Sequence, residues 1–385
     1  MKVNFTDIGI ILIMPIFIIK CTPDNKDNSI TINPVNEINL NTLDSFVERI
    51  EYFTLGENSE IPLNYIDKSF IIGDTLVIKC RERSPIYFFN LRGEFLFSQL
   101  PTGNESLMFS EASDICIFDV DNIMINDSKK RTIFKYNIRT RKITNEWKHN
   151  LTIFKFFYMD GNMLVLTNDF EKGLVKFIEN FNFNSPKILI KGTNITNFLI
   201  SPDPFCRIGN DEVLVNVGFH DTIYIVNLGT FSISQKYVIG EGESNLGSLD
   251  EGKLIEDIMK RNLKKYPKVF ILGGLPMVFN QNIIIPIVNT KRNILLSLTD
   301  NSSKLLDYKK SKGNLRLISA GFYPNLISNV IGKKGNIHFS VIDAGQVNEI
   351  DLSKIDQNNK YLADIKRLKD ANTQNPILVK FEYKD

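Results

Sequence analysis

Residues Phe70–Leu100 read FIIGDTLVIKCRERSPIYFFNLRGEFLFSQL and contain four short apolar runs separated by turn residues. Gly73-Asp74 separates the first two runs, the charged segment Arg81–Arg83 follows the second, and Gly93 precedes the fourth. Runs of this length that are rich in Ile, Val, Phe and Tyr and end at Gly, Asp or Asn are typical of antiparallel strands. Four such strands in succession form a meander, which is the unit of a β-propeller blade. The stretch therefore predicts one blade.

The same order of apolar run, tight turn and apolar run recurs along the chain, with turns about 40 to 70 residues apart, as expected for blades with insertions. Turn pairs such as Asp-Gly suit short hairpins because they tolerate positive φ. The six turns are Gly73-Asp74, Asp121-Asn122, Asp160-Gly161, Asn210-Asp211, Gln281-Asn282 and Lys334-Gly335. A third strand is expected after each, at Ile86–Phe89, Ile133–Tyr136, Val175–Ile178, Ile223–Val226, Ile294–Leu298 and Val347–Ile350. Residues 45–385 are thus predicted to form an all-β, six-bladed propeller of four-stranded antiparallel blades.

Two segments change from the strand period to a helical one. Apolar residues recur at three- and four-residue spacing within residues 249–264, which predicts a helical insertion between the fourth and fifth blades. Residues 354–368 predict a second short helix. Propellers often close by sharing one blade between the two ends of the chain, and the strands near Ile50–Leu55 and Ile377–Phe381 are the candidates for that closure.

The N-terminal segment reads as a targeting signal. Ile8–Ile19 is almost wholly apolar, which fits the central region of a signal peptide and is too short for a membrane span. Cys21 follows directly, so the segment resembles a bacterial lipoprotein signal in which Cys21 carries the lipid and anchors the chain to a membrane. Lys20 stands where such signals normally have a small residue, and the alternative is an uncleaved anchor with an ordinary thiol. We expect residues 1–20 to be the signal peptide and residues 21–44 a flexible polar tether.

The composition excludes some classes of function and favours none. A formal net charge of +2 over 385 residues gives no electrostatic case for nucleic acid. The sequence contains no zinc, P-loop or dinucleotide motif, and it implies no cofactor. Cys80 and Cys116 could pair if their α-carbons lay within about 7 Å. Free buried thiols are the alternative that we favour for Cys80, Cys116 and Cys206.

Several segments together resemble the six-bladed β-propeller lipoproteins of Bacteroidetes, over roughly residues 46–385. The matching segments are IEYFTLGE at residues 50–57, SPIYFFNLRGEFL at 84–96, TIFKYN at 132–137, FHDTIYIVN at 219–227 and NPILVKFEYK at 375–384. The resemblance implies a lipid-anchored protein of the cell envelope, at the outer membrane, and brings no activity with it. The family often has a Gly-x-Gly-Pro-Gly-Glu loop after its first blade, where this chain reads Gly103-Asn104-Glu105-Ser106.

The central channel is where a propeller would hold a ligand. Asp114, Asn197 and Tyr323 are the candidate residues at its mouth, because each precedes or begins an expected innermost strand. Asp and Asn oxygens are ligands that a calcium ion prefers, but the same residues also serve ordinary turn chemistry. The pair His220-Asp221 is likewise interpreted as a loop preceding a strand rather than as a catalytic pair.

Two functions stay open at this point. The first is a non-catalytic binding or scaffold module on the membrane, with a partner protein or glycan bound to one propeller face. The second is a metal-assisted hydrolase or lyase, similar to lactonases, that works in the channel with calcium. The aromatic run Phe154, Phe156, Phe157 and Tyr158 could resemble a sugar-stacking platform, but we expect it to pack between blades.

Overall fold

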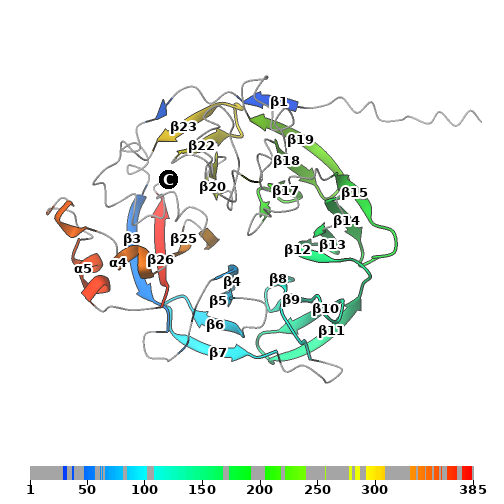
Figure 1. The fold of residues 1–385 in the computed structure, drawn as a ribbon, viewed down its shortest axis with the longest axis horizontal. Helices are drawn as coiled ribbons and strands as arrows, with labels where there is room; N and C mark the ends of the chain where they lie inside the picture. The colour runs from blue at the N-terminus through cyan, green and yellow to red at the C-terminus, as the bar shows by residue number, and fades with distance from the viewer. Residues whose placement is uncertain are drawn as a thin grey trace, which may run out of the picture.

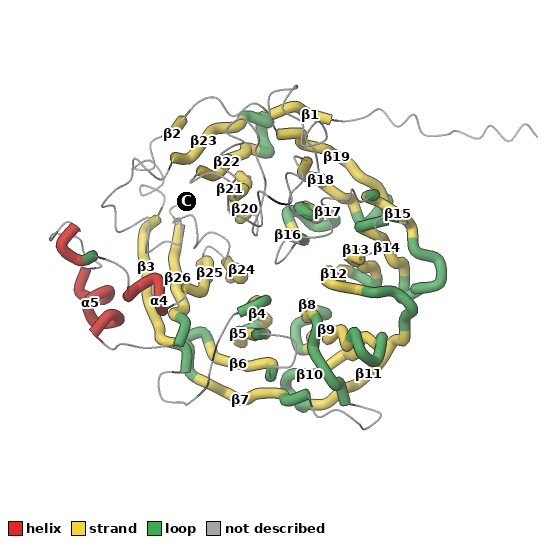
Figure 2. Tube along the Cα trace, in the orientation of Figure 1, coloured by secondary structure: helices red, strands yellow, loops and turns green. Residues whose placement is uncertain are grey.

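A computed structural model of the chain forms a ring of six β-sheets around a common centre, the position at which a propeller has its channel (Figure 1). Strands make up the ring; in this view α5 lies outside the blade that contains β3 and β26, and α4 overlaps that blade (Figure 2). The structure describes residues 29–32, 37–38, 47–56, 61, 63, 66–80, 85–101, 108–167, 173–191, 204–217, 222–239, 256, 277–279, 282–286, 292–307, 330–334, 337–342, 344–348, 351–354, 357, 362–370 and 375–383. The prediction of a six-bladed propeller is confirmed.

The stretch around residues 70–100 forms a blade, as predicted. Its four strands are β4 (Lys68–Ile72), β5 (Thr75–Lys79), β6 (Ile86–Asn90) and β7 (Phe95–Gln99), paired in that order and antiparallel. Gly73 has a φ of 57°, as the tight β4–β5 turn requires. The strand β4 lies at the channel and β7 at the outer rim.

The next four blades repeat this meander. The second contains β8 (Asp114–Ile117), β9 (Asn122–Asp127), β10 (Thr132–Asn137) and β11 (Lys142–Lys148); the third contains β12 (Ile153–Met159), β13 (Asn162–Thr167), β14 (Val175–Glu179) and β15 (Lys187–Ile190). The fourth contains β16 (Phe205–Arg207), β17 (Glu212–Val215), β18 (Thr222–Asn227) and β19 (Ser232–Ile239); the fifth contains β20 (Met277–Phe279), β21 (Asn282–Pro286), β22 (Arg292–Ser297) and β23 (Ser303–Asp307). The predicted turns at Gly73-Asp74, Asp160-Gly161 and Asn210-Asp211 lie between the first and second strands of their blades, and Asp121 directly precedes the second strand of its blade.

The sixth blade combines the C-terminal strand with the strand β3, which precedes the first blade in the chain. Its strands are β24 (Val330–Lys334), β25 (Ile337–Ile342), β26 (Ile377–Tyr383) and β3 (Val47–Thr54), in that order. The predicted closure is confirmed, because β26 pairs antiparallel with β3 from Ile377 opposite Thr54 onward. The third strand predicted at Val347–Ile350 is wrong. Val347 and Asn348 are instead the last two residues of the short helix α4 (Ala344–Asn348), and the C-terminal strand occupies the third position.

The closed blade is also attached to the first one. The amide of Gly56, just after β3, donates to the carbonyl of Gly93 at 2.8 Å. Gly93 has a φ of 78°, and a Cβ at this position would lie 2.9 Å from the carbonyl oxygen of Thr54. Only glycine fits this contact, so the β6–β7 turn is built to touch the strand that closes the ring.

Hydrophobic side chains hold neighbouring blades together. Val77 and Phe88 of the first blade pack in one cluster with Ile115, Ile125 and Phe134 of the second. The other described clusters join the second blade to the third, the third to the fourth, the fourth to the fifth and the first to the sixth. Burial of apolar surface between blades, at about 25 cal/mol per Å², is therefore the main force that stabilises the ring.

Part of the predicted tether is ordered as strand. The segment β1 (Ser29–Ile32) pairs parallel with β19, and β2 (Glu37–Ile38) pairs parallel with β23. The prediction of a segment without regular structure is wrong for these residues. Their backbone groups pair with the outer edges of two blades, edges that the polar composition of the segment does not reveal.

The helical predictions have different outcomes. The predicted helix at residues 354–368 is found as a 3₁₀ turn at Leu352–Lys354 and the helix α5 (Leu362–Asp370), whose Leu362, Ile365 and Leu368 are buried. The insertion at 249–264 lies outside the described residues except for the helical residue Glu256. None of the helices in the described part of the chain combines the length and the apolar character that a membrane-spanning helix needs.

Candidate functional site

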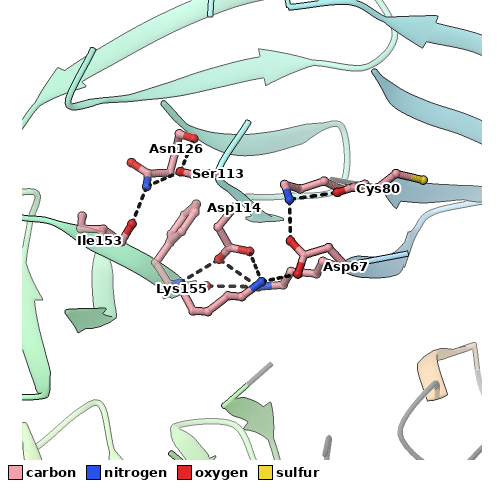
Figure 3. Close-up of polar contacts among 10 residues, drawn as sticks. Asp67, Cys80, Ser113, Asp114, Asn126, Ile153 and Lys155 are labelled. Atoms are coloured by element: carbon pink, nitrogen blue, oxygen red, sulfur yellow. Dashed lines mark hydrogen bonds and ion pairs between the residues drawn. The ribbon is translucent and has the colours of Figure 1, made fainter. Parts of the chain in front are cut away.

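Five charged side chains of the first three blades meet in what we call the lysine–aspartate cluster: Asp67, Lys68, Lys79, Asp114 and Lys155 (Figure 3). Lys79 ends the second strand β5 and Asp67 directly precedes β4, whereas the other three lie on inner strands. Lys68 begins β4, Asp114 begins β8, and Lys155 lies near the start of β12. Equivalent positions of successive inner strands meet at the same level of the channel, which is why residues far apart in sequence become neighbours.

Asp114 links all three blades. Its Oδ2 accepts from the Lys68 ammonium at 3.3 Å and from the amide of Phe156 at 2.9 Å. Its Oδ1 lies 3.6 Å from the Lys155 Nζ and accepts no hydrogen bond from the described residues. The carboxylate is fully buried, and its ion pairs compensate for the cost of removing it from water.

Asp67 forms the second half of the cluster. It accepts from Lys155 at 2.9 Å and from the fully buried Lys79 at 2.5 Å. Burial alone would raise the pKa of Asp67, but the ammonium groups of Lys155 and Lys79 outweigh burial and lower this pKa below its ordinary value. Lys79 also donates to the carbonyl of Cys80 at 3.1 Å. Lys155 thus bridges two carboxylates that come from different blades.

A second, uncharged network lies between the second and third blades. The Asn126 amide donates to Ser113 Oγ at 2.8 Å and to the Ile153 carbonyl at 3.1 Å (Figure 3). Its carbonyl oxygen lies 3.1 Å from His149 Nε2, and His149 Nδ1 lies 2.9 Å from the carbonyl of Leu151. Burial lowers the pKa of His149 below 6.5. Both imidazole nitrogens face oxygen atoms, so the neutral ring, which carries a single N–H, can donate to only one of the two.

Next to the cluster, the channel opens into a pocket of about 460 Å³. The first four blades contribute its walls: Lys68 and residues 70–73, residues 116–120, residues 157–160, and Phe205 with Arg207. Most of these side chains are apolar or aromatic, and few are charged. A small-molecule site usually has this composition and a volume of roughly 300–1,000 Å³.

The rim of the pocket is apolar and accessible. Val120, in the β8–β9 turn, is 75% exposed, and Ile117 at the end of β8 is 40% exposed. Arg207, also at the pocket, donates to the carbonyls of Gly209 and Asn210 and is held over the turn that follows β16. The pocket therefore has a buried, charged end at Lys68 and an apolar, solvent-exposed end at Ile117 and Val120.

The residues predicted from sequence fall in different places. Asp114 does reach the channel, as the first residue of an inner strand, but its side chain is buried in ion pairs. Asn197, Tyr323, Cys21, the pair His220-Asp221 and the loop Gly103–Ser106 lie outside the described residues. Within the described part of the chain, no three His, Cys, Asp or Glu side chains are grouped so that they could hold a metal ion.

The aromatic run packs between blades as expected, with one exception. Phe156 is fully buried, and Tyr158 stacks on Phe118 with ring centroids 4.6 Å apart. Phe154 is 36% exposed because the register shifts between Ile153 and Lys155. This bulge removes Phe154 from the face that simple alternation assigns to it.

The three cysteines that the structure describes form no disulfide, as favoured from the sequence. Cys80 and Cys116 are buried, and Cys206 is partly buried. Burial raises the pKa of Cys80 to about 11, so its thiol is protonated at neutral pH and poorly reactive.

Sequence reasoning missed the three lysines of the cluster. Each lies in a strand that is otherwise largely apolar, such as KSFII at residues 68–72 or TLVIK at 75–79. A lysine at the end of such a strand usually reaches solvent, so the sequence alone did not mark these residues. The signal that could have found them is Lys155, which stands inside the run IFKFFYM at residues 153–159.

A comparison with solved structures supports the propeller fold through one neighbour. A Bacteroides fragilis protein that is described as exported superposes with a TM-score of 0.64 over 93% of this chain and 100% of its own, at 13% identity. BamB from Moraxella catarrhalis gives a TM-score of 0.41 over 67% of this chain and 66% of its own, at 10% identity. At this identity the first likeness shows the fold alone. No curated protein matches the sequence.

The sequence itself carries the family assignment. The sequence model of the family described as "6-bladed beta-propeller" matches residues 22–314, which is more than half of the chain. The six sheets of the structure agree with that description. The chain therefore belongs to the 6-bladed beta-propeller family.

Proposed function

We propose that this chain is a lipid-anchored protein of the bacterial cell envelope whose propeller is a non-catalytic binding module for a partner protein or glycan. The observation that carries the binding role is the pocket of about 460 Å³ with its exposed rim at Ile117 and Val120. The leader that ends at Cys21 and the resemblance to envelope lipoproteins support the anchor. The similar protein from Bacteroides fragilis is described as exported, which supports a location outside the cytoplasm.

The charged groups favour binding over turnover. In the lysine–aspartate cluster, each carboxylate is engaged by at least two lysines, at 2.5 to 3.6 Å. A catalytic acid or base needs a proton that can move at the working pH. The lowered pKa of Asp67 keeps this carboxylate ionised instead. We assign the cluster a structural task, which is to fix the three inner strands that form most of the pocket wall.

A pair of tryptophan variants tests the binding role. Ile117→Trp adds bulk at the pocket rim, and Leu96→Trp adds the same bulk on the outer strand β7, where Leu96 is 45% exposed. The full-length protein in detergent would be screened by thermal shift against calcium, magnesium, zinc, envelope glycans and simple lactones. A ligand at a hundred times its Kd stabilises by about 2.7 kcal/mol, which is measurable as a shift in Tm.

We expect a glycan to raise the Tm of the wild type and of Leu96→Trp, and to lose this effect in Ile117→Trp. A shift that is equal in all three proteins would remove the pocket from the proposal. A shift produced only by a divalent ion would contradict the non-catalytic binding role as stated.

A further inference from the structure

The N-terminal segment runs along the outside of the ring and is fixed to it. The strand β1 pairs with β19 from Ser29 opposite Lys236 to Ile32 opposite Ile239, and β2 pairs with β23 at Glu37 and Ile38. The chain then enters the sixth blade as β3. Figure 1 shows β1 outside β19 at one edge of the ring. The strand thus adds a fifth member to the fourth blade, whose outer edge it covers.

Side-chain packing supports this attachment. Ile30 of β1 packs against the hydrophobic cluster shared by the fourth and fifth blades, which includes Leu214, Ile223 and Tyr237. Ser29 and Thr31, on the other side of the strand, are exposed. The alternation of a packed and two exposed residues is that of a docked edge strand, and Ser29 is the first described residue that pairs with the propeller.

The join lies close to the proposed lipid. Eight residue steps separate Cys21 from Ser29, and a fully extended chain spans at most about 3.6 Å a step, so their α-carbons can be no more than about 29 Å apart. A blade of four strands at about 4.8 Å spacing is about 14 Å deep, so the outer edges of opposite blades are separated by more than about 28 Å plus the channel. A lipid on Cys21 must therefore lie nearer to the outer edge that carries β1 than to the outer edge of the opposite blade.

We propose that the outer edge of the fourth blade, where β1 covers β19, faces the membrane, and that the first blade, with β7 at its rim, points away from it. This inference rests on the lipid anchor at Cys21 proposed above. The occupant of the β1–β19 edge is a phospholipid surface. In the ring, β4–β7 stand three blades from β16–β19, on the opposite side (Figure 1).

Two matched serine-to-cysteine variants test the orientation. Ser232 on β19 and Ser98 on β7 are both exposed and lie on the outermost original strands of the opposite blades. Each would be replaced by Cys in a Cys206→Ser background, since Cys80 and Cys116 are buried. The full-length lipidated protein, labelled with a donor dye, would be reconstituted in phosphatidylcholine vesicles that contain an acceptor-labelled phosphatidylethanolamine.

We expect a higher energy-transfer efficiency from Ser232→Cys than from Ser98→Cys, and loss of this difference when a long Gly-Ser linker is inserted between Asn28 and Ser29. Equal transfer from the two positions, or greater transfer from Ser98→Cys, would overturn the orientation while leaving the anchor intact. The anchor is tested separately by incorporation of labelled palmitate, which Cys21→Ala should abolish. If the wild type takes up no palmitate, both the anchor and the orientation fail.

Discussion

The strands β8 and β12 are joined in two different ways at their two ends. At the start of the strands, Asp114 pairs with Lys155 and with the amide of Phe156. At their far ends, rings take over: we call Phe118, Trp147, Tyr158 and Phe181 the aromatic cluster, in which Trp147 stacks on Phe181 with centroids 4.1 Å apart. Buried ion pairs have a desolvation cost and are strongly destabilised by the loss of one partner. Stacked aromatic rings are stabilised by burial and carry no such cost. The contact between β8 and β12, which we call the seam, therefore has a polar end that is sensitive to substitution and an apolar end that is less sensitive.

Loss of the central carboxylate should have the largest effect. Asp114→Ala removes a fully buried carboxylate that accepts from Lys68 and from the amide of Phe156 and that pairs by charge with Lys155. We expect the free energy of unfolding to fall by about 3 kcal/mol, the lower end of the range for a broken buried pair. Urea unfolding followed by the fluorescence of Trp147, the single tryptophan, would measure it.

The matched control is Asp114→Asn, which keeps an acceptor for the Phe156 amide and should lose less. Asp370→Ala, at the exposed end of α5, should change little. If Asp114→Ala proves as stable as Asp370→Ala, the polar end of the seam contributes nothing.

Truncation in the aromatic cluster should cost less. Trp147 is only partly buried, so Trp147→Ala loses part of the contact with Phe181 and Phe118 and leaves a space that solvent can reach. We expect a loss of about 2 kcal/mol, below the range for a fully buried aromatic residue. Circular dichroism replaces fluorescence for this variant. A loss greater than that of Asp114→Ala would reverse the comparison between the two ends.

The neutral network at the same seam should make stability depend on pH. Burial lowers the folded-state pKa of His149 below 6.5, so below that value the unfolded chain binds a proton that the folded chain does not. Stability from this group is therefore present above the unfolded pKa and is lost as the pH falls through the folded one. We expect the free energy of unfolding to decline as the pH falls below 6.5, and His149→Gln to flatten that part of the curve. An unchanged slope in the variant would show that other groups cause the decline.

The smallest effect should come from the exposed edge of the aromatic cluster. The Lys135 Nζ lies 4.0 Å from the centre of the Phe118 ring and 3.5 Å from Asp119 Oδ2. The side chains of Lys135 and Asp119 are partly exposed to water. Because such interactions are screened, Lys135→Met should cost less than about 1 kcal/mol. Lys142→Met, on an exposed position of the neighbouring strand β11, is the control for loss of a surface charge. A loss as large as that of Trp147→Ala would mean that the cation holds the cluster together.

Much of the fold could be predicted from the sequence, because turn chemistry and strand period are local. Asp160 and Gly161, with φ of 49° and 86°, adopt the positive values that the Asp-Gly pair suggested. The two parts that failed depend on distant partners. Val347 has strand propensity, but β26 already pairs with β25, so the segment forms part of α4. The strand β1 forms only because its backbone pairs with the edge of β19, which lies more than 200 residues away in the sequence.

The site was much less predictable. Asp114 was identified as a channel residue from its place before an apolar run, and it does lie at the channel. Its partners Lys68 and Lys155 come from positions 46 residues before it and 41 after it, and only the closure of the ring brings them together. The pocket rim at Val120 likewise looked like an ordinary turn. Pattern arguments find strands, whereas a site depends on which strands become neighbours.

Photo-cross-linking in intact cells is the most direct test of the binding role. A benzophenone side chain would be placed at Val120, which lines the pocket and is 75% exposed, and in a second protein at Ser98 on the outer strand β7. The proposal predicts a discrete adduct to a protein or glycan from Val120 and none from Ser98. The same adduct from both positions, or adducts from Ser98 alone, would contradict a binding site at the pocket.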